Sequence, residues 1–396
     1  MALKLRISRT VTIPDKVRLG RYARAPELGP RILFFSGGTA LNQVSRRMID
    51  YTHNSIHLIT PFDSGGSSAK LRYAFDMPAV GDLRNRLMAL SDQSVKGNPA
   101  VFRLFAYRFP KDLKQEELKK RLDRMVLGDD EMVADIPDPL RKIIRTHLNF
   151  FKSAMPEDFD LRGASIGNLV LAGGYLNNDR HLDPVVYLFG KLAEARGVVR
   201  PVINQSLHLT ADLEDGTRIV GQHQLTGREV PPIESPVTRL FLTGGNGDWD
   251  PVKPSIRQKT WDLISTAELI CYPMGSFYSS VVANLLPDGV VQAVAQADCP
   301  KVFLPNSGPD KECPGVTVEE MTRTLMQYLS NGSDFEPRQV LNLAVLDSKN
   351  GVYSSKPDTE ALEAMGVTVI DTDLVTPQSH PHYDPDRLLG VLLSLV

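Results

Sequence analysis

The feature that most constrains the fold of this chain is a pair of glycine-rich segments, each between a short apolar run and a helical stretch. The first reads Arg31-Ile-Leu-Phe-Phe-Ser-Gly-Gly-Thr39, and the second reads Asp63-Ser-Gly-Gly-Ser-Ser68. Such a pattern is typical of a parallel strand that leads into a helix beneath a phosphate, because glycine lets the backbone approach and the first helical N–H groups point at the anion. Two such segments, with an acid in the second, predict one crevice for an anionic ligand.

Strand and helix signals alternate along most of the chain, which predicts an α/β protein with a mostly parallel sheet covered on both faces. The expected strands are 31–35, 56–62, 237–242, 269–272, 301–305, 340–346 and 367–370. The expected helices are 41–51, 81–90, 165–176, 254–267, 279–286, 318–329 and 386–395. Alternation and an Asp-Gly turn predict a β-hairpin within 199–225. We expect one domain over 1–396, with a charged helical insertion at about 110–160 and a basic N-terminal arm over 1–30.

Composition excludes several classes of protein. The formal net charge is −2, so no global basic field favours nucleic acid or an acidic membrane surface. No run approaches the ~20 apolar residues of a membrane span. The three cysteines, Cys271, Cys299 and Cys313, lack zinc spacing and are expected to be free thiols in a reducing compartment. We therefore expect a cytoplasmic protein that binds neither nucleic acid nor membrane.

The first 24 residues are basic, and this composition has two interpretations. The charged residues are seven cations, Lys4, Arg6, Arg9, Lys16, Arg18, Arg21 and Arg24, and one acid, Asp15. A phosphate-binding arm or a transit peptide would have this composition. Alternation over Leu3–Ile7 instead favours an ordinary N-terminal strand with solvated charges.

Five loops are expected at the carboxyl ends of strands, where open parallel sheets bind their ligands. They are Ser36–Thr39, Asp63–Ser68, Thr243–Asp250, Pro273–Ser280 and Asn306–Pro309. Any one Gly-Ser loop alone is more often a tight turn. Their joint occurrence at successive strand ends favours a long, polar ligand with phosphate as the common group.

Three polar residues in or near these loops have both a functional and a structural interpretation. Asp63 is a candidate to hold a divalent cation or to accept a proton from a hydroxyl, or else it caps the turn that follows. Asp82 opens a helix after a glycine, which is typical of an N-cap. Asn168 lies just inside a helix start, where ligand contact and local capping are equally expected. His380 and His382 flank a proline and are more often part of an ordinary loop than a metal cluster.

Several motifs together resemble one family, the 2-phospho-L-lactate transferases (CofD) and the related gluconeogenesis factors (YvcK). Counterparts of that family's motifs occur in order at Gly37-Gly-Thr-Ala-Leu41, Asp63-Ser-Gly-Gly-Ser-Ser-Ala-Lys-Leu-Arg72, Pro78-Ala-Val-Gly-Asp-Leu-Arg-Asn85, Leu104-Phe-Ala-Tyr-Arg-Phe109, Gly163-Ala-Ser-Ile-Gly-Asn-Leu-Val-Leu171, Met274-Gly-Ser-Phe-Tyr-Ser-Ser280 and Lys301-Val-Phe-Leu-Pro-Asn306. The resemblance covers the chain from about residue 31 to 306. It is highly specific when the motifs are taken together.

The resemblance implies a Rossmann-like three-layer α/β/α fold and a crevice for a nucleoside diphosphate or nucleotide-sugar. The transferase branch moves a phospholactyl-type group from a guanosine diphosphate ester to a deazaflavin hydroxyl with Mg²⁺, whereas the regulator branch binds UDP-sugars. The implied catalytic residues are Asp63, also the Mg²⁺ ligand, Arg72 and Asn168, with Arg84 as an alternative cation. The implied nucleotide and phosphate contacts are Gly37, Gly38, Thr39, Gly65, Gly66, Ser67, Ser68, Asp82, Asn85, Gly275, Ser276 and Asn306.

The departures from the family pattern predict a divergent subgroup and leave two functions open. Ser64 replaces the family's second aspartate, Ala40 a glycine and Ala164 a histidine. The first function is a Mg²⁺-assisted transferase that acts on a nucleoside-diphosphate donor and a hydroxyl acceptor. The second is a nucleotide-sugar-binding regulator without turnover. A homodimer is expected from the resemblance alone. Tyr73, Phe75 and Met77 have two interpretations, a pocket for a flat aromatic acceptor or, more often for such side chains, part of the core.

Overall fold

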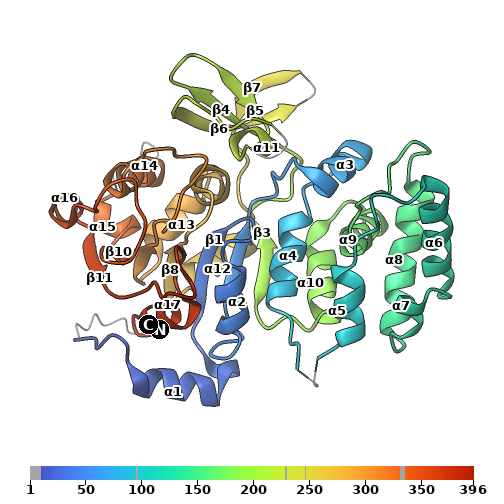
Figure 1. Ribbon diagram of the computed structural model, residues 1–396, viewed down its shortest axis with the longest axis horizontal. Helices are drawn as coiled ribbons and strands as arrows, with labels where there is room; N and C mark the ends of the chain where they lie inside the picture. The colour runs from blue at the N-terminus through green and yellow to red at the C-terminus, as the bar shows by residue number, and fades with distance from the viewer. Residues whose placement is uncertain (1–9, 95–96, 228–229, 246, 331–334) are drawn as a thin grey trace.

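A seven-stranded parallel sheet forms the centre of the protein in the computed structural model, which describes residues 10–94, 97–227, 230–245, 247–330 and 335–396 (Figure 1). Its spatial order is β11-β10-β9-β8-β1-β2-β3, and all neighbours are parallel. The strands are β1 (Ile32–Ser36), β2 (Ile56–Ile59), β3 (Val198–Pro201), β8 (Leu269–Tyr272), β9 (Lys301–Phe303), β10 (Leu343–Leu346) and β11 (Thr368–Asp371). The chain runs outward from β1 in one direction and later from β8 in the other, so the strand order reverses between β1 and β8.

Both faces of the sheet are covered, which confirms the predicted three-layer α/β architecture. Every residue of β1 is buried, as expected for a parallel strand between two layers. Leu33 and Phe35 pack in one hydrophobic cluster, and Ile32 and Phe34 pack in another on the opposite face. The helices that contribute to these two clusters are α2 (Asn42–Met48), α12 (Gln258–Ser265), α13 (Val290–Gln296), α14 (Val318–Ser330), α15 (Pro337–Val340), α16 (Thr359–Ala364) and α17 (Pro385–Leu392).

A helical layer extends beyond β2 and β3 and has a core of its own. Its members are α3 (Gly66–Phe75), α4 (Gly81–Ala89), α5 (Pro99–Ala106), α6 (Gln115–Leu127), α7 (Glu131–Ala134), α8 (Leu140–Ala154), α9 (Ile166–Asn177) and α10 (Leu182–Leu192). The charged segment at 110–160 is helical as predicted, and α6 and α8 lie at the right-hand edge of Figure 1. Leu118, Ile144 and Leu148 turn inward and join this core.

A second, antiparallel sheet has the order β5-β4-β6-β7. Its strands are β4 (His208–Leu213), β5 (Arg218–Val220), β6 (Val237–Gly245) and β7 (Asp248–Val252), with α11 (Gln222–Leu225) after β5. The hairpin predicted within 199–225 is present, with Gly216 at a φ of +84° in its turn, but its first residues belong to β3. The loop Thr243–Asp250 was predicted to follow a strand of the parallel sheet, and this prediction was wrong. The preceding strand, β6, pairs with β4 and β7 in the antiparallel sheet.

The segment after Asp15 differs from an extended basic arm. Residues Lys16–Arg24 form helix α1, because the Asp15 carboxylate accepts the N–H groups of Val17 and Arg18. Arg18 donates to the carbonyl oxygens of Ser394 and Val396, so α1 is tied to the C-terminal end of the chain. Figure 1 shows α1 at the opposite end of the molecule from α3. The strand predicted for Leu3–Ile7 lies outside the described residues.

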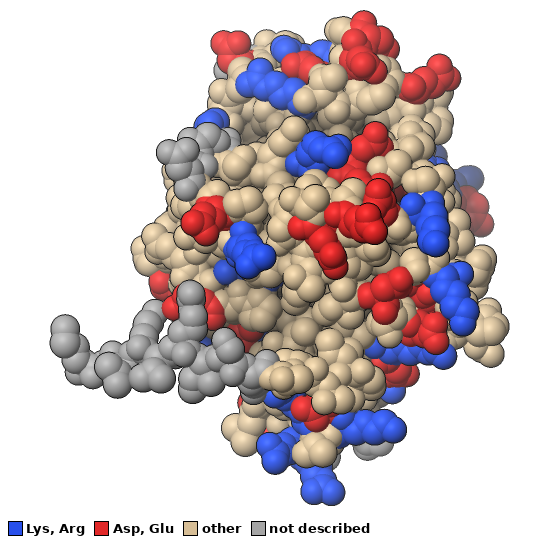
Figure 2. All heavy atoms as spheres, turned by 90° about the vertical axis from the view of Figure 1, so that its left-hand side faces the viewer, with Lys and Arg blue, Asp and Glu red and all other residues tan. Residues whose placement is uncertain are grey.

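Surface charge, helix length and the cysteines bear on the classes of protein that the composition argued against. On the face in Figure 2, acidic and basic side chains are interspersed, and no field of one sign extends across it. Within the described part of the chain, no helix has the length and apolar character needed to cross a bilayer. All three cysteines are free, as predicted.

Candidate functional site

The Gly37–Thr39 loop follows β1, directly at the position where the strand order reverses. A Cβ on Gly37 would lie 2.8 Å from the Ser280 hydroxyl oxygen and 3.0 Å from that of Thr60, so only glycine fits between these two elements. Gly38 has a φ of +26°, and Thr39 is exposed. The loop is therefore packed from beneath and open above, which is the arrangement needed for a backbone that approaches a ligand.

A crevice of about 90 Å³ lies between this loop and the loop after β8. Its walls are residues 36–41 on one side and Pro273, Met274, Gly275, Ser276, Ser280 and Val281 on the other. Two of the glycine loops predicted to converge thus face each other across the β1/β8 switch point. Open α/β sheets bind ligands at this kind of position.

Asp82 belongs to the crevice and is not the N-cap of α4. It lies inside the first turn, the N-cap residue is Val80, and the Asp82 carboxylate accepts the N–H of Gly38 at 2.9 Å. The N-cap interpretation was therefore wrong. One amide of the first glycine loop is already bonded to a carboxylate from another element, and this bond fixes the loop.

Asp63 is half-buried at the end of the segment that follows β2, and its Oδ1 accepts the N–H of Gly65 at 3.1 Å. The capping role weighed for Asp63 is thus present. Its Oδ2 lies 3.3 Å from the position that a Cβ on Gly81 would occupy. The Asp63 carboxylate therefore lies beside the residue that directly precedes Asp82.

The rest of the second glycine loop forms the start of α3. Gly66 has a φ of +50° and is exposed, and Ser67 is half-buried. Ser68 is buried, with its hydroxyl 2.4 Å from the position of a Cβ on Gly81. Only glycine at position 81 therefore lets α4 begin beside this loop.

Three buried arginines, Arg72, Arg84 and Arg86, lie on the helices after the two glycine loops, and they differ in what their guanidinium groups contact. Arg72 donates to the carbonyl oxygens of Phe62 and Asp63 and, at 2.7 Å, to that of Leu207. The structure thus gives Arg72 a positioning role beneath the Asp63 loop, whereas the sequence suggested a direct one. Burial lowers the pKa of Arg72, and the Asp63 carboxylate opposes that effect.

Arg86 and Arg84 lie on α4 next to Asp82. Arg86 is fully buried and donates to the Ser45 hydroxyl and, at 3.4 Å, to the Gly37 carbonyl. Arg84 donates to the Asn85 side chain and, at 3.4 Å, to a backbone carbonyl. Burial lowers the pKa of both arginines to about 10, and nearby Arg108 contributes to the shift at Arg84. Both groups stay cationic at neutral pH, and the contact of Arg86 with the Gly37 carbonyl places its positive charge behind the first loop.

Asn168 is buried in the first turn of α9 and reaches the second glycine loop. Its side-chain amide donates to the Ser67 hydroxyl at 3.4 Å, and its Oδ1 has no hydrogen-bond partner among the described residues. Asn85 is half-buried and accepts from Arg84. Asn168 therefore connects α9 to the Asp63–Ser68 loop, with one polar atom left for a further contact.

The loop after β8 is held by groups from the segment after β9. The side chain of Asn306 exchanges two hydrogen bonds with the Gly275 backbone, at 2.7 and 2.6 Å, and Gly275 has a φ of +143°. Residues Phe277–Val281 then form a π-helix, and a 3-10 turn follows over Val282–Leu285, where one α-helix was expected. Ser276 lies immediately before the π-helix and lines the crevice.

The amides of this π-helix are occupied by two acids that the sequence analysis did not identify. Asp310 accepts the N–H of Phe277 at 2.9 Å, and one Glu312 oxygen accepts those of Tyr278 and Ser279 at 2.9 Å each. Burial raises the pKa of both carboxyls, that of Glu312 to about 7, and the negative charge of Asp310 adds to the shift at Glu312. These N–H groups therefore do not point at a ligand, contrary to the phosphate interpretation of Pro273–Ser280.

A further pair missed from the sequence joins the second glycine loop to the smaller sheet. The Ser64 hydroxyl lies 2.8 Å from Nδ1 of His223 and also accepts the His223 N–H at 3.2 Å. Because the hydroxyl accepts from the amide, its own proton is available to Nδ1. The two residues are 159 positions apart, so no local pattern could have identified them.

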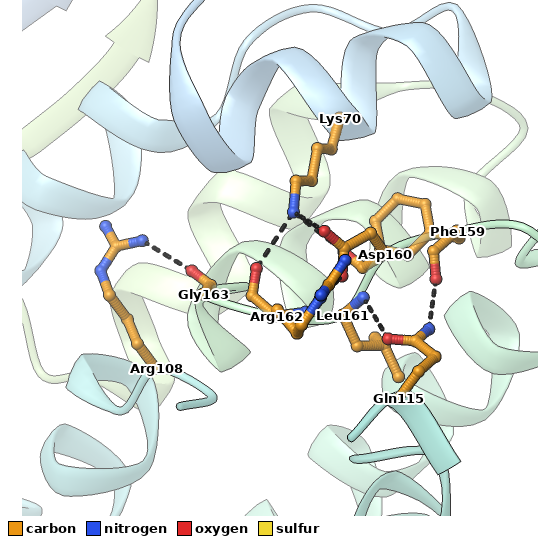
Figure 3. A network of polar contacts seen from close by, with 8 residues as sticks. All are labelled: Lys70, Arg108, Gln115, Phe159, Asp160, Leu161, Arg162 and Gly163. Carbon is orange, nitrogen blue, oxygen red and sulfur yellow. Dashed lines mark hydrogen bonds and ion pairs between the residues drawn. The ribbon is translucent and has the colours of Figure 1, made fainter. Parts of the chain in front are cut away.

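Helix α3 is anchored on its outer side by a polar network (Figure 3). The Lys70 ammonium lies 2.8 Å from the Asp160 carboxylate and donates to the Arg162 carbonyl at 3.0 Å. Arg162 also pairs with Asp160 and is the main cause of the strongly lowered pKa of that carboxyl, ahead of Lys70. Figure 3 shows Arg108 on the other side of the same loop, donating to the Gly163 carbonyl.

The residues proposed for an aromatic acceptor do not share a pocket. Tyr73 is 93% exposed, whereas Met77 and Phe75 are buried in the helical core, the latter against Phe151. His382 bonds the Ser307 carbonyl, as in an ordinary loop.

Whether the acidic side chains can hold a divalent cation depends on how many of them lie together. No cluster of three or more His, Cys, Asp or Glu side chains suited to a metal occurs among the residues that the structure describes. Mg²⁺ in nucleotide sites commonly uses only one or two carboxylates together with ligand phosphates. Asp82, which accepts the Gly38 N–H, and Asp63, whose Oδ2 lies 3.3 Å from the Cβ position of the preceding residue Gly81, fit that smaller donor set.

Comparisons with known proteins agree with this architecture. The family model described as 2-phospho-L-lactate transferase CofD matches residues 32–375. The chain is 28% identical to the gluconeogenesis factor of Bacillus subtilis (strain 168) over 376 residues, 93% of this chain and 98% of that protein. It is 26% identical over 354 residues to the gluconeogenesis factor of Halalkalibacterium halodurans, which covers 88% and 90% of the two chains. A crystal structure of a UPF0052 family protein from Bacillus halodurans covers 92% of this chain and 99% of its own, with a TM-score of 0.66 at 22% identity.

Proposed function

Because the chain belongs to the 2-phospho-L-lactate transferase CofD family, we propose that it binds the diphosphate of a nucleotide ligand between the loops after β1 and β8. We further propose that it transfers a phosphorus-containing group, of the phospholactyl type, from a nucleoside-diphosphate donor to a hydroxyl acceptor. The observation that carries the proposal is the crevice itself, where Gly37 and Gly275 face each other at the strand-order reversal.

The transfer needs positioning and charge neutralisation more than covalent chemistry by the protein. The acceptor oxygen forms a bond to the outer phosphorus, the bridging P–O bond to the nucleoside monophosphate breaks, and the hydroxyl proton passes to Asp63. Arg86, which donates to the Gly37 carbonyl, places positive charge behind the first loop. Asp63 and Asp82 would hold Mg²⁺, which when bound neutralises charge on the diphosphate.

The decisive variant is Asp63→Asn, because the amide keeps an oxygen for the Gly65 N–H and loses the charge. We expect donor binding to persist and Mg²⁺-dependent release of the nucleoside monophosphate to fall by roughly 1,000-fold. Asp215→Asn is the matched control, since Asp215 accepts the Thr217 N–H in the same local geometry within the β4–β5 turn. Turnover by Asp63→Asn at the wild-type rate would refute the transferase role.

A second candidate function is a nucleotide-sugar-binding regulator without turnover, and Ser64 favours it. This residue replaces the second acid of the motif, and its hydroxyl is engaged by His223. We expect such a protein to bind a UDP-sugar without Mg²⁺ and to release no product on long incubation. Ser64→Asp tests the distinction. If the replacement of the family's second aspartate by Ser64 abolished turnover, Ser64→Asp should gain Mg²⁺-dependent donor cleavage, which the wild type lacks.

A further inference from the structure

A larger cavity of about 450 Å³ lies next to the crevice, at the carboxyl ends of β9 and β10. Of its walls, only the segment Asn306–Pro309 was expected from the sequence to contact a ligand. Asn306 lines the cavity and also bonds the Gly275 backbone, and Gly275 lines the crevice. The two spaces are thus separated by one side chain on the same edge of the sheet. The crevice at about 90 Å³ is too small for a whole nucleotide, whereas the cavity has the size of a small-molecule site.

The charge on the cavity wall excludes an anionic occupant. Asp310 lines the cavity and forms no ion pair within the described part of the chain. Its carboxylate accepts from the Phe277 N–H and from Asn306, which are neutral donors. A phosphate or carboxylate in the cavity would face this acid without a paired cation. A neutral group with N–H donors would instead find an acceptor.

The remaining wall is apolar and contains a fixed aromatic ring. Val316, Val318, Met321 and Val352 contribute aliphatic surface. The Tyr353 hydroxyl accepts the Asp347 N–H at 3.1 Å and lies 2.9 Å from the Tyr383 hydroxyl, so two contacts fix the hydroxyl end of the ring. An apolar pocket with one immobilised ring favours a flat, neutral partner that stacks.

We propose that this cavity binds the nucleobase of the ligand whose diphosphate lies at the β1/β8 crevice. The ligand passes Asn306 on its way from one space to the other, and the base stacks within the apolar wall formed by Met321, Val352 and Tyr353. This inference rests on the proposed function for the diphosphate, and it adds a location and a chemical class for the other end of the ligand.

Two measurements test the proposal, with GDP, UDP and inorganic pyrophosphate as probes. In protein labelled with ¹³C in the methionine methyl groups, a bound base shifts the Met321 methyl resonance through its ring current. The Met48 methyl is the control because it is buried beneath α2 on the other face of the sheet. We expect GDP or UDP to move Met321 and not Met48, and pyrophosphate to move neither.

The second measurement is calorimetry on a cavity-filling variant. Val352 is 40% exposed, so Val352→Trp obstructs the cavity from its rim with little demand on the core. Val198→Trp, at an edge-strand position that is 38% exposed, is the matched control. We expect Val352→Trp to weaken nucleotide binding by about 10-fold or more and to leave pyrophosphate affinity unchanged. Val198→Trp changes neither.

The outcomes separate this inference from the proposed function. Nucleotide binding that neither shifts Met321 nor weakens in Val352→Trp overturns the base site while the crevice stands. A Met321 shift produced by pyrophosphate also overturns it, because the cavity would then accept an anion. If neither pyrophosphate nor nucleotide binds the wild type, the diphosphate proposal fails and the base site fails with it.

Discussion

The two loops that border the crevice are built alike but lie in opposite charge environments. In each, a carboxylate from another element accepts backbone N–H groups, Asp82 at Gly38 and Asp310 with Glu312 at Phe277–Ser279. Behind the first loop lies the buried cation Arg86, which donates to the Gly37 carbonyl. Around the second, burial raises the pKa of both acids, and the negative charge of Asp310 adds to the shift at Glu312.

The difference shows why a glycine loop alone does not identify an anion site. N–H groups at a helix start attract whatever negative charge is near, and here the protein supplies it. The surrounding charge decides whether a phosphate is tolerated as well. The β1 side, with Arg86 bonded to the Gly37 carbonyl, is the side suited to a diphosphate, and the side after β9 is suited to a neutral group.

The largest expected effect comes from filling the β1 side with Gly37→Val. The new side chain would collide with Ser280 and Thr60, so the loop must move. We expect the free energy of unfolding to fall by about 1–3 kcal/mol and nucleotide affinity to fall by about 100-fold. Chemical denaturation and calorimetry measure the two. Gly20→Val in α1, where a Cβ meets no atom within 4 Å, is the control for affinity. Unchanged affinity in Gly37→Val would place the ligand elsewhere.

A smaller effect is expected from the acid pair on the other side. The Glu312 carboxyl has its pKa raised to about 7, mainly by burial, so the fold favours its protonated form. The stability that the protonated Glu312 carboxyl contributes is fully present below pH ~4.5, the ordinary pKa range of a glutamate. It is lost as the pH rises through about 7. We expect the wild type to lose on the order of 2 kcal/mol of stability over that pH range. Glu312→Gln lacks the titrating group, so its urea midpoint should change less with pH.

Glu360→Gln is the control for this pH dependence, because Glu360 is an exposed residue in the first turn of α16. Its profile should follow that of the wild type. A wild-type slope that persists in Glu312→Gln would assign the titration to another group.

The smallest effect is expected at the anchor of α3, the helix that begins in the second glycine loop. Lys70→Gln loses the ion pair with Asp160 and weakens the bonds to two backbone carbonyls. We expect a cost of about 1 kcal/mol and faster hydrogen exchange in α3. Lys152→Gln breaks a comparably exposed ion pair, with Asp123, and should cost about 0.5 kcal/mol or less. Equal costs would mean that the carbonyl contacts of Lys70 contribute nothing.

Much of the sheet was predictable because parallel strands are apolar over their whole length. β1 and β8 were located almost to the residue from their buried runs, and the charged helices between 110 and 160 from their periodicity. The failures came where a local pattern had more than one tertiary outcome. A strand-like run at 237–242 has the same composition in either sheet, and the residues 277–285 adopt a π-helix and a 3-10 turn that helical spacing does not distinguish.

The sequence by itself determined the fold class, the family and the glycine loops at the strand ends, because those depend on short-range patterns and on the order of motifs. Tertiary structure alone decided what each loop's N–H groups contact. Asp82 reaches Gly38 across 44 residues, Ser64 meets His223 across 159, and the cavity beside Asn306 is formed by two separate segments, 306–321 and 352–354. The physical reason is that a hydrogen bond or a cavity wall depends on the distance between atoms in space, and chain separation carries no record of that distance.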